Sequence, residues 1–136
     1  MTRSEARTNA FLQVFQLYAN SDLELTEPVP LEDGLVLESD PFVTKLVNET
    51  VNHLEEIDQI IVENLRGWQL NRVSKVSLAI LRISIAQLLY FSDIPVGPII
   101  NEAVNLSKRF GDFKDYQFVN GLLGRAAKTC RTSEES

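Results

Sequence analysis

The segment from Val76 to Tyr90 limits the folds open to this chain more than any other, because eleven of its fifteen residues are apolar. A membrane-spanning helix needs about 20 apolar residues, so this segment is too short to cross a bilayer, and it carries Arg82 near its middle. Its length favours a helix, although periodicity alone leaves a strand open for part of it. A helix that is apolar on most sides has to be covered by other elements. We therefore expect a central helix with the remaining chain packed around it.

Apolar residues recur at three- and four-residue steps on both sides of this centre, which predicts further helices. These are expected at residues 2–20, 41–66, 98–110 and 115–128. Asp40 followed by Pro41 is a strong helix start, and Gly67 ends the long helix that follows. Gly121 and Gly124 lie inside the last helix, where glycine is costly, and predict the close approach of a neighbouring helix or ligand. No segment shows the alternation and turn signals of a β-hairpin, so the expected fold class is all-α.

The length of 136 residues fits one domain, here taken as residues 1–136. Residues 22–40 contain seven carboxylates, two prolines and a glycine and are expected to form an acidic loop, and residues 129–136 a polar tail. A single cysteine and a single histidine exclude a disulfide framework and a His- or Cys-rich zinc site within one chain, so we expect neither metal nor cofactor. The polar residues 1–9 contain no secretory signal, which favours a cytoplasmic protein.

The formal net charge of −6 is distributed unevenly along the chain. Residues 20–63 contain twelve acidic residues and one basic residue, a net charge of −11, whereas residues 64–131 contain ten basic and four acidic residues, a net charge of +6. Such asymmetry is typical of a chain with one surface for an anionic partner and a separate acidic surface. Two solvated faces without a partner would give the same pattern, and charge alone does not choose between them.

The sequence offers few groups for catalysis. His53 lies beside the apolar stripe of the long helix in a Glu-rich stretch, where a structural or surface role is favoured. Cys130 has basic neighbours that favour the thiolate, but without a histidine partner it is not expected to be a nucleophile. Arg82 needs a carboxylate partner, for which Glu102 is the nearest candidate. Because glycine-rich phosphate loops and Gly-x-Ser-x-Gly elbows are also absent, we predict no catalytic residues and no enzymatic activity.

Binding residues are better represented, in two places. Arg3 and Arg7 lie four residues apart at the start of the first helix, and Gln16 follows on its polar side. The last two helices and their connection carry a basic cluster interleaved with aromatic residues: Lys108, Arg109, Phe113, Lys114, Tyr116, Phe118, Arg125 and Lys128. Basic side chains bind phosphates and aromatic rings stack on unpaired bases, which is how single-stranded RNA is commonly bound. In the alternative, Phe118 belongs to the core and the lysines only aid solubility, and composition alone favours that alternative.

Short motifs follow one another over nearly the whole chain outside residues 22–39. In order, they are Arg7-x-x-Ala10, Gln16-Leu17-Tyr18, Ile57-Asp58-x-x-Ile61, Ala79-Ile80-Leu81-Arg82-Ile83, Ile94-Pro95, Ile100-Asn101-Glu102-Ala103-Val104, Lys108-x-Phe110-Gly111 and Phe118-Val119-Asn120-Gly121-Leu122-Leu123. Each motif is weak alone, but their order and spacing together are specific. They resemble the NusB family of bacterial transcription antitermination factors.

The resemblance implies an all-α, NusB-like domain of about seven helices in two packed helical bundles. It also implies binding of the boxA element of ribosomal RNA leader transcripts, as a heterodimer with a small ribosomal subunit protein, NusE. In the family, this complex joins elongating RNA polymerase and suppresses premature termination during ribosomal RNA synthesis. Some relatives self-associate, so a homodimer of the free protein is left open.

The resemblance implies roles for individual residues as well. The implied RNA-binding residues are Arg3, Arg7, Gln16, Lys114 and Phe118. The implied partner-binding residues are Tyr18, Gln87, Leu88 and Phe91.

Two departures from the family pattern bear on function. Family members often carry a run of arginines at the N-terminus, whereas this chain has only Arg3 and Arg7 with Glu5 between them, which should weaken RNA binding and flatten its salt dependence. Gln87 stands where the family commonly has a glutamate, so the partner interface is expected to differ. One alternative is therefore a protein-only adaptor with the same fold and weakened RNA binding. Another, if the chain is a fragment, is a domain that precedes an RNA cytosine methyltransferase.

Overall fold

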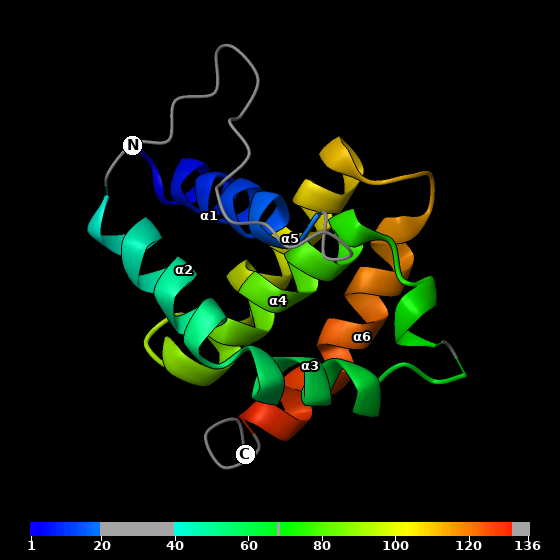
Figure 1. Ribbon diagram of the computed structural model, residues 1–136. Helices are drawn as coiled ribbons and strands as arrows, with labels where there is room; N and C mark the ends of the chain where they lie inside the picture. The colour runs from blue at the N-terminus through cyan, green and yellow to red at the C-terminus, as the bar shows by residue number, and fades with distance from the viewer. Residues whose placement is uncertain (20–39, 68, 132–136) are drawn as a thin grey trace.

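Six α-helices and one short 3-10 helix make up the computed structural model, which describes residues 1–19, 40–67 and 69–131 (Figure 1). They are α1 (Arg3–Tyr18), α2 (Pro41–Asn52), α3 (Leu54–Glu63), η1 (Leu70–Arg72), α4 (Lys75–Tyr90), α5 (Val96–Phe110) and α6 (Asp115–Cys130). No strand occurs in these residues, and the all-α prediction is confirmed. The predicted acidic loop lies outside the described residues except for Asp40. Of the predicted polar tail at residues 129–136, Thr129 and Cys130 belong to α6, and residues 132–136 lie outside the described residues.

The central helix is α4, as the apolar segment predicts. It contacts each of the other five α-helices, and eleven of its sixteen residues are buried. The helices α1, α2 and α4 contact one another, as do α4, α5 and α6, so two packed groups share α4 (Figure 1). The helix α3 contacts α2, α4 and α6. The largest fully buried side chains come from all six α-helices: Phe11, Leu46, Ile57, Ile61, Ile80, Leu81, Ile83, Ile85, Leu88, Ile99, Leu122 and Leu123.

Side-chain caps explain where α1 and α2 begin. In a capping box at α1, the Glu5 N–H donates to Thr2 Oγ1 (3.0 Å) and the Thr2 N–H donates to Glu5 Oε1 (2.8 Å). At α2, Asp40 Oδ1 accepts hydrogen bonds from the N–H groups of Phe42 (2.8 Å) and Val43 (3.2 Å). These acceptors satisfy N–H groups that have no partner inside the helix. The predicted helix start at Asp40 is confirmed.

The long helix expected at residues 41–66 is two helices, which meet at His53. His53 has φ −120° and ψ 26°, outside the helical range, and its N–H donates to the Glu49 carbonyl (3.1 Å). Its ring packs on Tyr90 with the ring centroids 4.2 Å apart. The apolar spacing continues through this junction without a glycine or proline, so periodicity contains no sign of the break. Because of the break, α3 packs on α4 and α6 as well as on α2.

The predicted close approach of a neighbouring helix at Gly121 and Gly124 is wrong, and the ligand alternative stays a prediction. A Cβ atom at Gly121 would meet only the guanidinium of Arg125, at 3.4 Å, and one at Gly124 would have no such neighbour within 4 Å. Space is tight instead at Gly111, where a Cβ atom would lie 2.8 Å from the Ser107 carbonyl oxygen. Glycine is therefore required at the end of α5, where the Gly111 N–H also donates to that carbonyl (2.8 Å).

Candidate nucleic-acid interface

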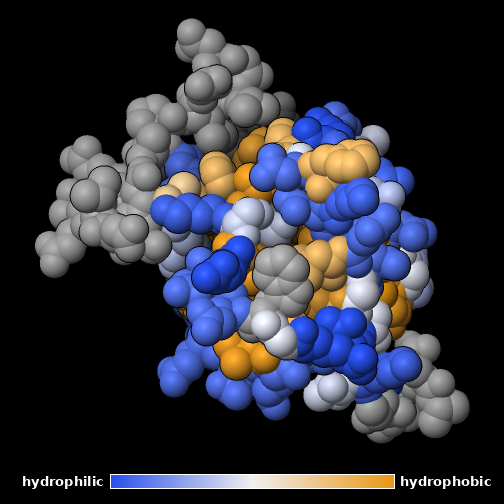
Figure 2. Space-filling model, turned by 90° about the vertical axis from the view of Figure 1, so that its right-hand side faces the viewer, coloured by the Kyte–Doolittle hydropathy of each residue, from blue (hydrophilic) through white to orange (hydrophobic). Residues whose placement is uncertain are grey.

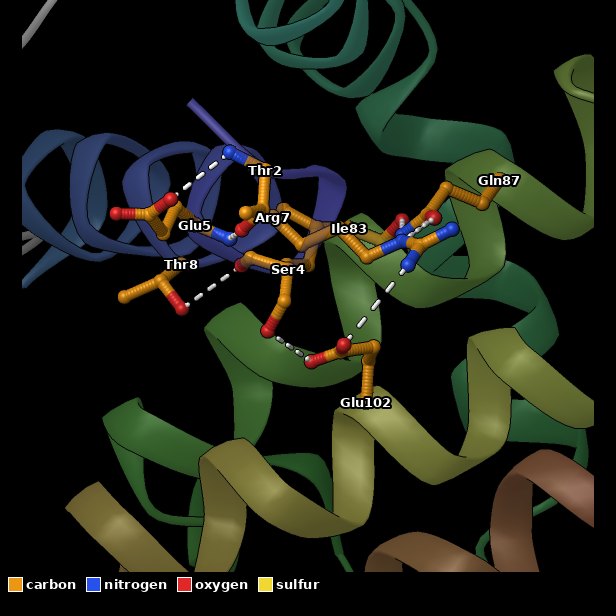
Figure 3. Close-up of polar contacts among 8 residues, drawn as sticks. All are labelled: Thr2, Ser4, Glu5, Arg7, Thr8, Ile83, Gln87 and Glu102. Carbon is orange, nitrogen blue, oxygen red and sulfur yellow. Dashed lines mark hydrogen bonds and ion pairs between the residues drawn. The ribbon is translucent and has the colours of Figure 1, made fainter.

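Arg7, one of the predicted RNA-binding residues, is buried, with 6% of its surface exposed. Its Nε donates to Oε1 of Gln87 (2.8 Å), and its Nη1 lies 4.0 Å from Oε1 of Glu102 (Figure 3). Ser4 Oγ donates to the other carboxylate oxygen of Glu102 (3.2 Å). The structure thus brings Arg7 and Gln87, from the two predicted sites, into one network that fixes the first turns of α1 to α4 and α5.

The charge of Arg7 is retained inside this network. Burial lowers the pKa of its guanidinium, Glu102 acts in the opposite direction, and Arg3 lowers the pKa further. An arginine side chain nevertheless keeps its proton in proteins, so a buried cation needs a compensating partner. Glu102 supplies the opposite charge and Gln87 accepts a hydrogen bond. We conclude that Arg7 positions α1 in this conformation.

Arg3 is exposed and lies beside α2. Its Cζ atom is 4.0 Å from the centroid of the Phe42 ring, within the range of a cation–π contact. The Phe42 ring meets the Phe91 ring in a T-shaped arrangement, with centroids 5.4 Å apart. Lys45 Nζ lies 4.7 Å from the Phe91 ring centroid. Two cations therefore flank a pair of aromatic rings where α1 starts beside α2.

Gln16 and Tyr18 lie near the end of α1, about 20 Å along the helix from its start. Gln16 is buried and Tyr18 is half-buried. The guanidinium of Arg82 lies 4.9 Å from the Tyr18 ring centroid and donates two hydrogen bonds to Asp58, from Nε to Oδ1 (2.9 Å) and from Nη2 to Oδ2 (2.8 Å). The prediction that Arg82 pairs with Glu102 is wrong, because Asp58 holds it.

The predicted partner-binding residues lie in two environments. Tyr18 lines an open cavity of about 490 Å³ together with Phe15, Leu70, Asn71, Val73, Lys75, Leu78, Ala79 and Arg82. Gln87, Leu88 and Phe91 are buried, with 1%, 1% and 4% of their surfaces exposed. Their side chains have little surface to offer a partner in this conformation. Their partner-binding roles stay predictions.

The connection between α5 and α6 interleaves cations with aromatic rings. Lys114 is exposed, and its backbone is left-handed (φ 76°, ψ −2°) at the start of α6. Its Nζ lies 5.5 Å from the ring centroid of Phe113. Lys108 Nζ lies 4.9 Å from the ring centroid of Tyr116. This connection therefore presents positive charge and ring faces together.

The rest of the predicted basic cluster is dispersed. Phe118 is half-buried and lines a small cavity of about 70 Å³. Arg125 donates from Nη2 to the Asn64 carbonyl (2.7 Å), which ties α6 to the end of α3. Lys128 is exposed in the last turn of α6, about 21 Å along the helix from Lys114. The members that stay together are those near the α5–α6 connection.

An open groove joins the start of α1 to the last turns of α5. Its volume is about 340 Å³, and its lining residues are Ser4, Glu102, Asn105, Leu106, Lys108 and Arg109. The Phe11 and Phe110 rings, 5.2 Å apart, hold α1 against α5. The groove places Ser4, in the first turn of α1, beside Lys108 and Arg109, and none of the five predicted RNA-binding residues lines it. Figure 2 shows the side of the molecule that carries the α5–α6 connection, where hydrophilic residues surround small, separate apolar areas.

Arg131 is a buried residue that sequence reasoning missed. Only 3% of its surface is exposed. Its guanidinium donates to the carbonyls of Leu88 (3.0 Å), Gln87 (3.1 Å) and Phe91 (2.9 Å), and also to that of Ile94. These carbonyls lie at the end of α4 and just beyond it. Arg131, the residue after α6, therefore caps the C-terminal end of the central helix. No sequence signal points to Arg131, because all four of its acceptors are backbone groups.

Metal binding, membrane insertion and thiol chemistry each require a particular arrangement of residues. Within residues 1–19, 40–67 and 69–131, no three histidine, cysteine or acidic residues are grouped so that they could hold a metal ion. Among the helices of this part of the chain, none has the length and apolar character needed to cross a membrane. Burial raises the pKa of the Cys130 thiol to about 11, which disfavours the reactive thiolate at neutral pH.

The two helical groups that share α4 define a small all-α protein. Residues 4–128 match the family model described as "NusB family". Because this match covers most of the chain, the protein belongs to the NusB family. The resemblance inferred from the motifs is confirmed.

Individual relatives agree with this assignment. The chain is 45% identical over 129 residues to the transcription antitermination protein NusB of an Exiguobacterium species, covering 94% of this chain and 98% of that protein. The solved structure of T. maritima NusB has a TM-score of 0.78 and 32% identity, covering 94% of this chain and 92% of that one. A chain in a structure described as a crystal structure of a plectonemic RNA supercoil has a TM-score of 0.76 and 29% identity, covering 97% and 98%. The family confirms the prediction of a transcription antitermination protein that is not an enzyme.

Proposed function

We propose that this protein binds boxA-type single-stranded RNA in ribosomal RNA leader transcripts together with the small ribosomal subunit protein NusE. The bound complex joins the RNA polymerase antitermination complex in the bacterial cytoplasm and prevents premature termination. The observation that carries the proposal is a surface on which the basic last turns of α5 line one groove with the start of α1 and continue into the α5–α6 connection, where cations and aromatic rings are interleaved. The similar chain in the structure described as an RNA supercoil supports it.

The cations on this surface set the expected electrostatic behaviour. Arg3, Lys108, Arg109 and Lys114 are exposed, and each is free to contact a phosphate with a small movement of its side chain. For single-stranded nucleic acid, each phosphate contact adds about 0.7 to the slope of log affinity against log salt, so four contacts predict a slope of about −3. Arg7 contributes indirectly, because its bonds to Gln87 and Glu102 hold the helix that carries Arg3.

The test is the affinity for a labelled boxA-type RNA, measured by fluorescence anisotropy between about 50 and 200 mM salt. We expect Lys114→Ala to weaken binding and to reduce the magnitude of the salt slope by about 0.7. Lys128→Ala is the matched control, because it removes an exposed lysine from the far end of the same helix. Equal effects of the two substitutions would contradict this assignment of the RNA surface.

A second candidate function, the protein-only adaptor, is favoured by the burial of Arg7. Of the two arginines at the start of the chain, Arg3 alone is exposed, which reduces the number of phosphate contacts available to this arm. An adaptor would bind NusE equally well with and without RNA. Binding of labelled NusE that tightens when boxA-type RNA is added would reject the adaptor.

A further inference from the structure

Phe113 stands out among the described residues because its side chain is 88% exposed. The other large apolar side chains described are less than half exposed. A single exposed apolar residue is ordinary on a protein surface, so exposure alone does not indicate a site. The surroundings of Phe113 are more informative than its exposure.

The backbone around Phe113 forms a fixed, tight connection. The Asp112 N–H donates to Asp115 Oδ2 (2.9 Å), and the Asp115 N–H donates to the Asp112 carbonyl (3.1 Å). Between them, Lys114 adopts a left-handed conformation, which is uncommon for a residue with a side chain and is kept only where the surrounding structure imposes it. Phe113 therefore projects from an ordered turn, and binding through its ring costs little additional ordering.

The charges around Phe113 are too few to bind an RNA by themselves. Residues 108–116 contain three basic and two acidic residues, a net charge of +1. Such a small excess attracts a polyanion only weakly, so a second source of affinity is needed here. An aromatic ring beside a lysine supplies it, because an unpaired base stacks on the ring while the ammonium approaches the adjoining phosphate. Lys114 Nζ lies 5.5 Å from the ring centroid, so it is close enough to contact the phosphate that adjoins a base stacked on Phe113.

We propose that Phe113 is the stacking platform for one unpaired base of a single-stranded RNA, and that Lys114 contacts the phosphate next to that base. This inference rests on the proposed function. It identifies the contact that supplies the non-electrostatic part of the affinity for RNA. Every base has a π face, so Phe113 adds affinity without selecting the base. Sequence preference must then come from other contacts.

The test compares Phe113→Ala, Phe113→Leu and Phe113→Tyr in the same anisotropy assay, on a short boxA-type RNA and on a scrambled RNA of equal length. Phe113→Ala is expected to bind about 5- to 150-fold more weakly, by a similar factor on both RNAs. Its salt slope is expected to equal that of the wild type, because stacking releases no counterions. Phe113→Tyr keeps a ring and should bind like the wild type, whereas Phe113→Leu should lose nearly as much as Phe113→Ala.

Controls separate the failure of this inference from failure of the proposed function. Val62→Ala removes another exposed apolar side chain, on α3, and should leave RNA binding unchanged. If Phe113→Ala or Phe113→Leu binds both RNAs like the wild type while Lys114→Ala binds more weakly, the stacking role is overturned and the proposed function stands. If Phe113→Ala weakens NusE binding but not RNA binding, the ring belongs to a protein contact and the inference is wrong. If the wild type binds neither RNA, both proposals fail.

Discussion

Replacing Arg131 by alanine should destabilise the protein by removing the group that closes the central helix. In the folded chain, this buried guanidinium donates to four backbone carbonyls at the end of α4 and just beyond it. Hydrogen bonds from a charged donor are stronger than those between neutral groups. An alanine at this position leaves the carbonyls without that donor and leaves the space of the guanidinium unfilled.

The size of the effect follows from the carbonyls that lose their donor. The Gln87 carbonyl also accepts the Phe91 N–H (3.0 Å), and the Phe91 carbonyl also accepts the Ile94 N–H (2.9 Å), so these two stay bonded. The carbonyls of Leu88 and Ile94 depend on Arg131. A buried polar group left unsatisfied costs about 1–3 kcal/mol. Water that enters the space left by the guanidinium reduces the total cost for the two carbonyls. We therefore expect the free energy of unfolding to fall by about 3 kcal/mol.

Urea denaturation followed by circular dichroism measures this change. With a slope of about 1–3 kcal/mol per molar urea, the transition midpoint should fall by more than about 1 M. Lys128→Ala removes an exposed side chain from the last turn of α6, three residues before Arg131, and should stay within about 0.5 kcal/mol of the wild type. Arg131→Lys should recover only part of the loss, because an ammonium lacks the planar fork that reaches several carbonyls. An Arg131→Ala variant that unfolds at the wild-type midpoint would show that these hydrogen bonds do not stabilise the fold.

Two further predictions concern Asp58 and Cys130. Asp58→Asn weakens the paired hydrogen bonds to Arg82 and should lower the free energy of unfolding by about 2 kcal/mol in the same urea assay; an unchanged midpoint would show that the pair adds nothing. Burial raises the pKa of the Cys130 thiol from 9.0 to about 11, so the folded state favours the protonated thiol. The stability from this group is complete below about pH 9 and is lost as the pH rises towards about 11. At pH 9 the folded chain should therefore react with iodoacetamide more slowly than the urea-unfolded chain, and equal rates would contradict the burial argument.

The fold was predictable from apolar spacing, because burial on helical faces determines it. The run from Val76 to Tyr90 predicts a helix covered on most sides, and α4 is that helix. The break at His53 could not be predicted in this way. It depends on how the chain turns to lay α3 across α4 and α6, where the His53 ring packs on Tyr90. Apolar spacing records which side of a helix is buried, but not where one helix bends into the next.

Whether a polar contact could be predicted from the sequence depends on the kind of partner that the side chain has. Arg7 precedes Phe11 by four residues and Val14 by seven, so its spacing already places it on the buried face of α1. Charge suggested an RNA contact, whereas this spacing indicates burial. The partner of Arg82 could not be read from spacing, because it depends on which helices are neighbours in the fold. Arg131 is harder still, because backbone carbonyls leave no trace in the sequence.

A salt-titrated binding curve for a boxA-type RNA, measured with and without NusE, decides whether this protein binds RNA or only its protein partner. We predict RNA binding that weakens with a salt slope of about −3 and tightens when NusE is present. Absence of RNA binding in both conditions, with NusE still bound, would contradict it and would identify the protein as an adaptor.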